Sequence, residues 1–345
     1  MSANYDYTLP SELIASAPAE PRDNARLFIY DTRADRVTLD AFMNIAAYLP
    51  ADSLLVLNDT KVVPARLTLA KPTGGKITIL FLANEWDRGE MIKGLPDKGV
   101  EPGVKLSLGG SPVVEPISHV DEEYSFRLLV SPAEFERLCE EHGQTPLPPY
   151  IHSPMKESDR RQRYQTTFAA KPASVAAPTA SLHFTERVFK SLSHKGIHTA
   201  PVTLHVGRGT FSPVTEAMKD ASALHTEPVE VSVASASAIA DAKRAGRMIV
   251  AAGTTATRVL ESASGQIAKG ESYKGETSIF IAPPYEFKLV DALITNFHLP
   301  GTSLLMLLDA FLQQKGSKKT WRELYELAIA EKFRFYSFGD AMLVV

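Results

Sequence analysis

A run of short β-strands inside an otherwise mixed α/β chain is the sequence feature that most restricts the fold. Between Arg66 and Val130 the apolar residues fall in brief runs that glycines separate. Regularly spaced short strands with glycine turns are typical of a small barrel or sandwich. The four clearest runs are 66–69, 77–81, 104–108 and 126–130, and the intervening glycines are Gly74, Gly75, Gly89, Gly103, Gly109 and Gly110.

The segments on either side of this run have a different character. The apolar residues 54–57 predict a buried strand, and the polar Asn58, Asp59 and Thr60 follow it directly. After the proline-rich connector 146–150, strands and helices alternate, with strands near 200–206 and 247–252 and a helix over 235–245. We therefore expect a mixed α/β main domain, formed by residues 1–65 and 149–345, that carries an all-β, barrel-like insert of residues 66–148.

Composition excludes several classes of protein. The 345 residues are 44% hydrophobic and 22% charged, which is typical of a globular protein and not of a disordered one. The start of the chain lacks the pattern of a signal peptide, and no apolar run spans a membrane. The single cysteine, Cys139, excludes an intrachain disulfide and a thiolate zinc cluster. We expect a cytoplasmic monomer that binds no metal.

A net charge of −3 gives no general attraction for nucleic acid, but a local patch is still able to bind it. Two clusters of basic residues are candidates for RNA contact, although most clusters of this kind are simply solvated faces. The first consists of Lys156, Arg160, Arg161, Arg163 and Lys171, and the second of Lys315, Lys318, Lys319 and Arg322.

Residues 173–185 have the composition of a binding-site wall. Small side chains let the backbone approach a ligand, and Pro178 stiffens the loop. Pro178, Thr179 and His183 are the expected contributors. Thr185 is placed to cap a helix that begins at Glu186. A plain loop entering a helix is the alternative.

A second candidate is the turn Gly253-Thr254-Thr255 between a strand and a helix. The free N–H groups and positive dipole end of such a helix start attract a carboxylate or phosphate. The sequence lacks the remaining residues of a Walker loop or of G-x-G-x-x-G, so neither a nucleoside triphosphate nor a dinucleotide is indicated. A tight turn with a capping threonine is an equally good interpretation.

Four histidines lie at the ends of predicted elements: His183, His205, His225 and His298. Their common position at polar or glycine-rich junctions favours one cleft for proton transfer, although any single histidine is more often structural. Glu227 follows His225 closely, and Gly207 and Gly209 allow close backbone approach beside His205. Near the C-terminus, residues 334–342 alternate as a half-buried strand would, and Asp340 interrupts them.

Taken in order, these segments resemble the S-adenosylmethionine:tRNA ribosyltransferase-isomerase family of queuosine biosynthesis. The resemblance covers most of the chain. It rests on Tyr5-Asp6-Tyr7 with Leu9-Pro10, Arg22-Asp23 with Arg26-Leu27, Leu57-Asn58-Asp59-Thr60 with Pro64-Ala65-Arg66, Leu147 to Ile151, Arg163-Tyr164-Gln165-Thr166, Ser174 to Thr185, Thr203 to Phe211, His225 with Glu227, Gly253-Thr254-Thr255, Pro283-Pro284-Tyr285, Asn296 to Pro300, and Tyr336 to Met342.

The resemblance implies an α/β domain with an inserted β-barrel and two substrates, S-adenosylmethionine and the tRNA anticodon arm. The implied reaction moves the ribosyl part of S-adenosylmethionine onto 7-aminomethyl-7-deazaguanine and isomerises it to epoxyqueuosine, with release of adenine and methionine. S-adenosylmethionine is then a co-substrate and no separate cofactor is needed. Because the sulfonium acidifies the neighbouring C5′ hydrogen, a base is required, and an acid helps adenine to leave.

For these roles we expect His205 or His298 as the base, with Asp340 or Glu227 supporting the acid or holding the substrate. The residues expected to contact substrate are Asn58, Asp59, Arg66, Tyr164, Gln165, Pro178, Thr179, His183, Gly207, Gly209, Thr210, His225, Gly253, Thr254, Thr255 and Asn296.

The chain departs from the family pattern at a few positions. Ala173 and Ser181 stand where glycine is usual, Ser222 stands where histidine is usual, Arg208 stands where a smaller residue is common, and the insert matches poorly. Two alternatives therefore stay open. One is a divergent paralogue that binds S-adenosylmethionine or a related nucleoside with another acceptor, and the other is a non-catalytic RNA-binding protein. A methyltransferase is disfavoured because no glycine-rich loop with a following ribose-binding acid is present.

Overall fold

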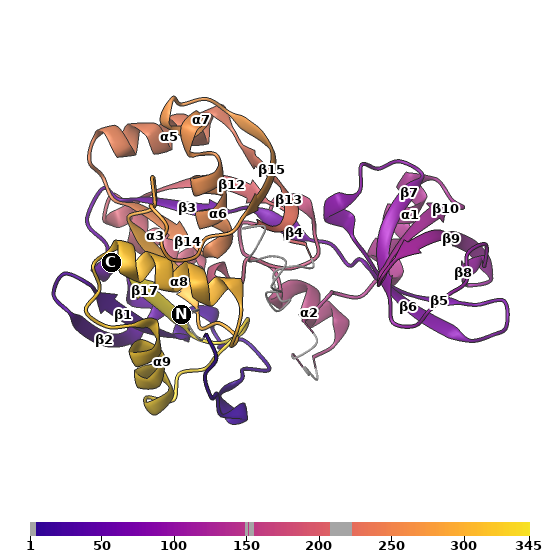
Figure 1. Cartoon of the computed structure of the whole chain (residues 1–345), viewed down its shortest axis with the longest axis horizontal. Coiled ribbons are helices and arrows are strands. Elements are labelled where there is room, and N and C mark those ends of the chain that lie inside the picture. Colours follow the sequence, from indigo (N-terminus) through magenta and orange to yellow (C-terminus); the bar gives the residue numbers. More distant parts are fainter. Residues whose placement is uncertain (1–4, 149–150, 152–154, 208–222) are drawn as a thin grey trace.

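The structure is a computed structural model, and it describes residues 5–148, 151, 155–207 and 223–345. An α/β body built on a large sheet and a smaller β-barrel lie side by side (Figure 1). The neck between them contains α2 (Glu157–Arg163) and a parallel pair of strands, β4 (Thr60–Val62) and β11 (Lys171–Ser174). The predicted fold class, a mixed α/β domain with a barrel-like insert, is confirmed.

Nine strands of the described residues form one mixed sheet. Four adjacent strands, β12, β3, β14 and β16, run parallel, so their carboxyl ends meet at the same edge. In sheet order the strands are β15 (Tyr273–Ile279), β13 (Ala223–Val231), β12 (His198–Leu204), β3 (Leu54–Asn58), β14 (Ile249–Ala252), β16 (Ala292–Asn296), β17 (Ala341–Val344), β1 (Arg26–Asp31) and β2 (Arg36–Ala41).

Helices cover both faces of this sheet, which explains why its central strands are apolar throughout. Leu54 and Val56 of β3 belong to the core beneath one group of helices, and Leu55 and Leu57 belong to the core on the opposite face. The first group comprises α5 (Val233–Arg244), α6 (Thr254–Ser262), α7 (Ser264–Ala268), α8 (Ser303–Gln314) and α9 (Trp321–Ala330). The second comprises α3 (Glu186–His194) and the 3-10 helix η3 (Phe42–Tyr48).

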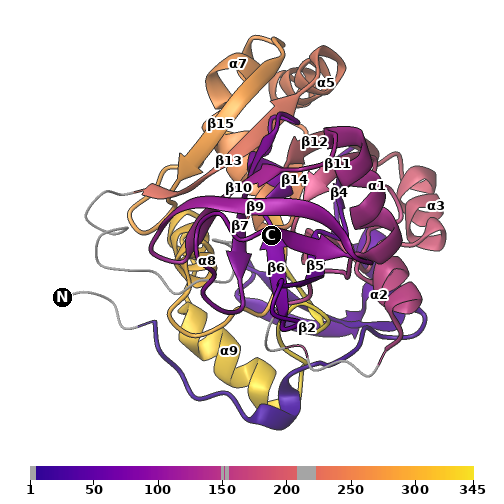
Figure 2. The ribbon, with the colours of Figure 1, turned by 90° about the vertical axis from the view of Figure 1, so that its right-hand side faces the viewer.

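The barrel is closed and entirely antiparallel, and it lies in front of the sheet in Figure 2. Its strands alternate between core and solvent, as Ile77, Ile79 and Phe81 do on β6. In order around the barrel they are β10 (Glu123–Leu128), β7 (Met91–Pro96), β6 (Lys76–Phe81), β5 (Arg66–Ala70), β8 (Leu106–Leu108) and β9 (Ser111–Val120). These strands lie within the expected insert, but the limits of the two domains stay a prediction.

Short helices complete the barrel and the chain connections. Helix α1 (Pro132–His142) starts at the capping Ser131, whose side chain accepts from the Glu134 amide, and it packs Phe135 and Cys139 against the barrel core. Burial raises the pKa of the Cys139 thiol to about 12, so this cysteine is an unreactive core residue. Besides η3, the described 3-10 helices are η1 (Ser11–Leu13), η2 (Arg22–Asn24), η4 (Ala83–Glu85) and η5 (Thr179–Ser181).

The strand expected over residues 334–342 is wrong in its first part. Only Ala341–Val344 form a strand, β17, and a tight loop precedes it. Tyr336 adopts a positive φ of 71°, and the Gly339 amide donates to the Tyr336 carbonyl. A Cβ on Gly339 would lie 2.5 Å from the Arg334 carbonyl oxygen, so the loop closes only with glycine there.

Candidate active site

The loop of residues 173–185 crosses the carboxyl edge of the parallel strands. The Ser174 hydroxyl accepts from the Val206 amide at 2.7 Å, just beyond the end of β12. The Ser181 hydroxyl donates to the Ala252 carbonyl at the end of β14. Side chains of the loop therefore fix it to the ends of two of these parallel strands, where open α/β sheets bind their ligands. As predicted, the Thr185 side chain caps α3 by accepting from the Val188 amide.

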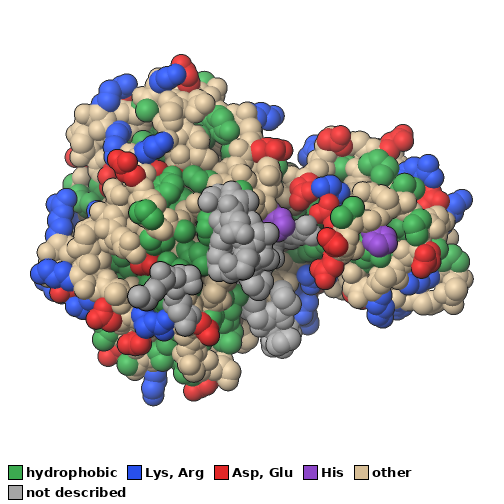
Figure 3. Space-filling model, in the orientation of Figure 1, with side chains coloured by type: hydrophobic (Ala, Val, Ile, Leu, Met, Phe, Trp, Pro, Cys, Tyr) green, Lys and Arg blue, Asp and Glu red, His purple; other side chains and the backbone are tan. Residues whose placement is uncertain are grey.

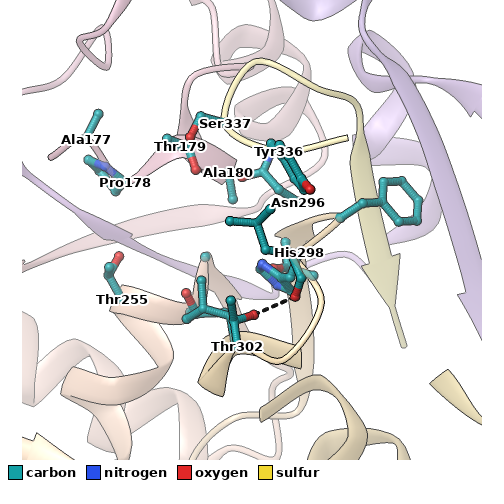
Figure 4. Close-up of a pocket in the computed structure, with 16 residues that line it drawn as sticks. Ala177, Pro178, Thr179, Ala180, Thr255, Asn296, His298, Thr302, Tyr336 and Ser337 are labelled. Atoms are coloured by element: carbon teal, nitrogen blue, oxygen red, sulfur yellow. Dashed lines mark hydrogen bonds between the residues drawn. The ribbon is translucent and has the colours of Figure 1, made fainter. Parts of the chain in front are cut away.

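A cavity of about 50 Å³ lies where this loop meets β14 and β16 (Figure 4). Seven of the predicted residues line it: Pro178, Thr179, Gly253, Thr254, Thr255, Asn296 and His298. The Thr179 hydroxyl donates to Asn296 Oδ1 at 2.8 Å and thereby links the loop to β16. Tyr336 and Ser337 also line the cavity and were not predicted, because the loop that presents them was taken for a strand.

The family departures at Ala173 and Ser181 do not narrow this cavity. Neither residue lines it. Ala173 belongs to β11, and the Ser181 hydroxyl is used in the bond to the Ala252 carbonyl. The departures at Ser222 and Arg208 lie outside the residues that the structure describes.

His298 is a buried, neutral residue of the cavity wall. Its Nε2 lies 2.8 Å from the Thr295 hydroxyl, and its amide donates to the Tyr325 hydroxyl. Burial lowers its pKa to about 3, so the ring stays uncharged at neutral pH. A ring that is so hard to protonate is a weak proton acceptor, although it can still hydrogen-bond to a ligand.

His205 lies at the end of β12, on the other side of the parallel strands. Its Nδ1 lies 2.8 Å from the Thr60 hydroxyl, which orients the ring. Burial lowers its pKa, and the nearby Asp59 carboxylate opposes that effect. Strands β12 and β16 are three strand spacings apart, which is about 14 Å, and His205 and His298 follow their respective ends. The two rings face different parts of any ligand that lies along this edge.

Glu227 on β13 is engaged by groups of the protein itself. The Gly207 amide donates to its Oε1 at 2.7 Å, and Arg258 of α6 forms an ion pair with its Oε2. Both side chains of the ion pair are about 95% buried. Arg258 was not predicted as a site residue. It is the first charged residue of α6, after four uncharged ones, and that position was a signal that it has a specific partner.

Asp340 is similarly occupied. Its oxygens accept from the backbone amides of Arg26 and Arg334, and the Arg334 guanidinium lies 3.2 Å away. The carboxylate closes the loop before β17 and is not aimed into the cavity. His183 is buried beside Phe42, and burial lowers its pKa to about 4.

The remaining predicted residues lie along the strand ends and the neck. Asn58 joins β3 to β12 through both of its side-chain groups, which bond to the Leu204 amide and carbonyl. Asp59 accepts from the Thr203 hydroxyl. Gln165 bonds to the backbone of Val62 through both of its side-chain groups, accepting from the amide and donating to the carbonyl. Arg66 bonds to the Leu147 carbonyl, and Tyr164 packs against Phe338.

His225 is not brought to the cavity. Together with Lys93 and Glu123 of the barrel it lines a separate polar cleft of about 530 Å³ between the barrel and β13. Gly209 and Thr210 lie outside the described residues. The structure thus places part of the predicted set in one cavity and spreads the rest over the strand ends, the neck and the interdomain cleft.

Clusters of metal ligands and membrane-spanning helices are both absent from the part of the chain that the structure describes. The described residues contain no group of three or more His, Cys, Asp or Glu side chains that could hold a metal ion. They also contain no helix that is long and apolar enough to cross a bilayer.

The fold is that of an α/β protein with an inserted β-barrel and a small cavity at the carboxyl edge of its parallel strands. Sequence comparison places it more narrowly. The chain belongs to the family described as "Queuosine biosynthesis protein", which matches residues 2–344.

Curated relatives match over nearly the whole chain. The S-adenosylmethionine:tRNA ribosyltransferase-isomerase of Thermus thermophilus is 44% identical over 350 residues, covering 99% of this chain and 98% of the relative. The protein of the same name from Trichlorobacter lovleyi is 41% identical over 341 residues, with the same coverage. A crystal structure of S-adenosylmethionine tRNA ribosyltransferase from Thermotoga maritima aligns with a TM-score of 0.56 at 32% identity, covering 99% of this chain and 100% of that one.

Proposed function

We propose that this protein transfers the ribosyl group of S-adenosylmethionine to 7-aminomethyl-7-deazaguanine in tRNA and isomerises it to epoxyqueuosine, releasing adenine and methionine. The observation that carries this conclusion is the match over 99% of the chain, at 41–44% identity, to relatives named S-adenosylmethionine:tRNA ribosyltransferase-isomerase. The chemistry needs S-adenosylmethionine as a co-substrate and no other cofactor.

S-adenosylmethionine lies along the carboxyl edge of the parallel strands, between His298 and His205. Its sulfonium acidifies the adjacent C5′ hydrogens, so a neutral imidazole can accept one of them as a proton while the electron pair stays on C5′ as an ylide. His205 is the better base of the two, because the burial that brings the pKa of His298 to about 3 makes that ring too weak an acceptor. The Thr60 hydroxyl supports this role by fixing the ring through Nδ1.

Glu227 and Asp340 act as positioning residues in this scheme. Both carboxylates are already bonded to amides and a guanidinium of the protein, so neither is free to pass a proton to adenine. Glu227 holds the backbone of Gly207, two residues after His205, and Asp340 holds the loop that presents Tyr336. Removal of the Glu227 carboxylate would therefore displace His205, and removal of the Asp340 carboxylate would displace the cavity wall at Tyr336.

The tRNA approaches the neck between the barrel and the body. The first basic cluster is concentrated there, on α2 and β11, next to the strand ends. Charges of both signs are interspersed on the face seen in Figure 3, which does not favour a general nucleic-acid-binding surface. We propose a monomer, working in the cytoplasm where its tRNA substrate is found, with domains divided at residues 65 and 149.

The direct test is to incubate the protein with S-adenosylmethionine and tRNA that carries the precursor base, and to quantify free adenine and methionine by chromatography. We expect both products in equal amounts, and none with tRNA that lacks the base. A divergent paralogue would bind S-adenosylmethionine and release no adenine with this tRNA. A non-catalytic RNA-binding protein would bind the tRNA with strong salt dependence and release nothing.

A further inference from the structure

The start of helix α6 lines the cavity of Figure 4 through Gly253, Thr254 and Thr255. No side chain caps this nine-residue helix, and the amides of Thr254, Thr255 and Ala256 have no acceptor among the described residues. Gly253 enters the helix with a φ of 95°, a conformation in which a side chain is strained. Free amides and the positive end of the helix dipole together attract a negative charge.

Two buried side chains add independent signs of a missing ligand. Asn296 is only 4% exposed, and its Nδ2 has no partner in the described part of the chain. Its Oδ1 accepts from the Thr179 hydroxyl, so the amide is oriented with the NH₂ group left as a donor. The Thr255 hydroxyl is also buried and has no partner among the described residues. A buried donor left without an acceptor is costly, so both groups indicate a ligand that accepts hydrogen bonds.

Charge and size narrow the ligand further. Among the described residues, those that line the cavity include no Asp, Glu, Lys or Arg, so none of these side chains repels or neutralises an anion. Its volume of about 50 Å³ is far below the 300–1,000 Å³ of pockets that enclose a whole small molecule. A carboxylate fits this description because it is small, carries one negative charge and accepts several hydrogen bonds.

We infer that this cavity binds the carboxylate of the methionyl group of S-adenosylmethionine. The assignment rests on the proposed function, which supplies this molecule as the donor substrate. With the carboxylate held between β14 and β16, the ribose and adenine extend along the strand ends toward β12 and His205. The cavity thus orients the substrate so that the methionyl end lies at Asn296 and the reacting C5′ group lies nearer the base.

The test compares S-adenosylmethionine with decarboxylated S-adenosylmethionine, using calorimetric titration of the full-length protein. Asn296→Asp keeps the shape of the side chain and the acceptor for Thr179, but places a negative charge where the ligand's carboxylate would lie. Thr255→Val removes one donor at nearly constant volume. Asn24→Asp, at an exposed residue of η2 away from the cavity, is the matched control for the added charge.

The wild-type protein should bind S-adenosylmethionine at least about tenfold more tightly than the decarboxylated form, as expected for hydrogen bonds to a charged group. Asn296→Asp should weaken S-adenosylmethionine binding by about 10- to 100-fold and leave binding of the decarboxylated form nearly unchanged. Thr255→Val should cause a smaller loss with the same selectivity, and Asn24→Asp should behave as wild type.

Different results separate this inference from the proposed function. If the wild-type protein binds both nucleosides equally and still releases adenine, the proposed function stands and the carboxylate assignment is wrong. Equal weakening of both ligands in Thr255→Val also overturns the assignment, and this variant decides the matter if Asn296→Asp fails to fold. A wild-type protein that binds neither nucleoside overturns the proposed function and the assignment with it.

Discussion

The buried ion pair between Glu227 and Arg258 gives a sharp prediction about stability. Both side chains are about 95% buried, and among the described residues neither forms an ion pair with any other side chain. Glu227→Gln leaves the guanidinium buried without a counter-charge, and Arg258→Met does the same to the carboxylate. Removing one partner of such a pair costs about 3–5 kcal/mol, a large share of the 5–15 kcal/mol that holds a typical protein folded.

The measurement is urea denaturation at pH 7 with a reporter for the α/β body alone. The chain has two tryptophans, one packed against the barrel core at Trp86 and one on α9 at Trp321. In a Trp86→Phe background the fluorescence therefore follows the body that contains the ion pair. The free energy of unfolding should fall by about 3–5 kcal/mol in Glu227→Gln and in Arg258→Met.

The double variant Glu227→Met/Arg258→Met is the control that separates charge from packing. Because it leaves neither charge buried, its loss should be well below the sum of the two single losses. Single losses below about 1 kcal/mol, the range of an exposed ion pair, would refute the reasoning. A double loss equal to the sum would refute it as well.

Three further predictions concern the surroundings of the site. The pKa values of about 4 for His183 and about 3 for His298 lie below the ordinary 6.5, so these histidines take up protons in the unfolded chain before they do in the folded one as the pH falls. The free energy of unfolding should therefore drop by about 2 kcal/mol per histidine between pH 7 and pH 5. Urea titrations of His183→Gln over this range should show a smaller drop than wild type. Gly253→Ala should lower the free energy of unfolding by about 1–3 kcal/mol because Gly253 has a φ of 95°. The same variant should bind S-adenosylmethionine more weakly. A variant with wild-type stability and affinity would contradict the role of this turn. Thr185→Ala should cost about 1–2 kcal/mol in thermal or urea unfolding by removing the cap of α3, whereas Thr185→Ser should retain most of the stability.

The sequence predicted the fold class because its two parts differ in periodicity. Short alternating strands mark the barrel, and the continuous apolar run of β3 marks a strand buried on both faces. The loop before β17 was missed because residues 334–340 alternate as a strand does. Its shape depends on the positive φ of Tyr336 and the close approach at Gly339, which periodicity does not reveal.

The candidate site was predictable only where its residues follow parallel strands. Gly253 and Asn296 come just after or at the end of such strands, so the topology brings them together without any further information. Glu227 and Asp340 were singled out as chemical groups, but their hydrogen-bond partners lie far away in the sequence. Arg258 and the Gly207 amide are known as partners of Glu227 only once the sheet and α6 are assembled.

The most direct test of the account is the identity of the nucleoside that the protein makes in tRNA. After incubation with S-adenosylmethionine, tRNA carrying 7-aminomethyl-7-deazaguanine is digested to nucleosides and analysed by mass spectrometry. We predict that the precursor nucleoside is replaced by epoxyqueuosine in step with the release of adenine. A digest in which the precursor persists unchanged, with a protein shown to bind both substrates, would contradict the account.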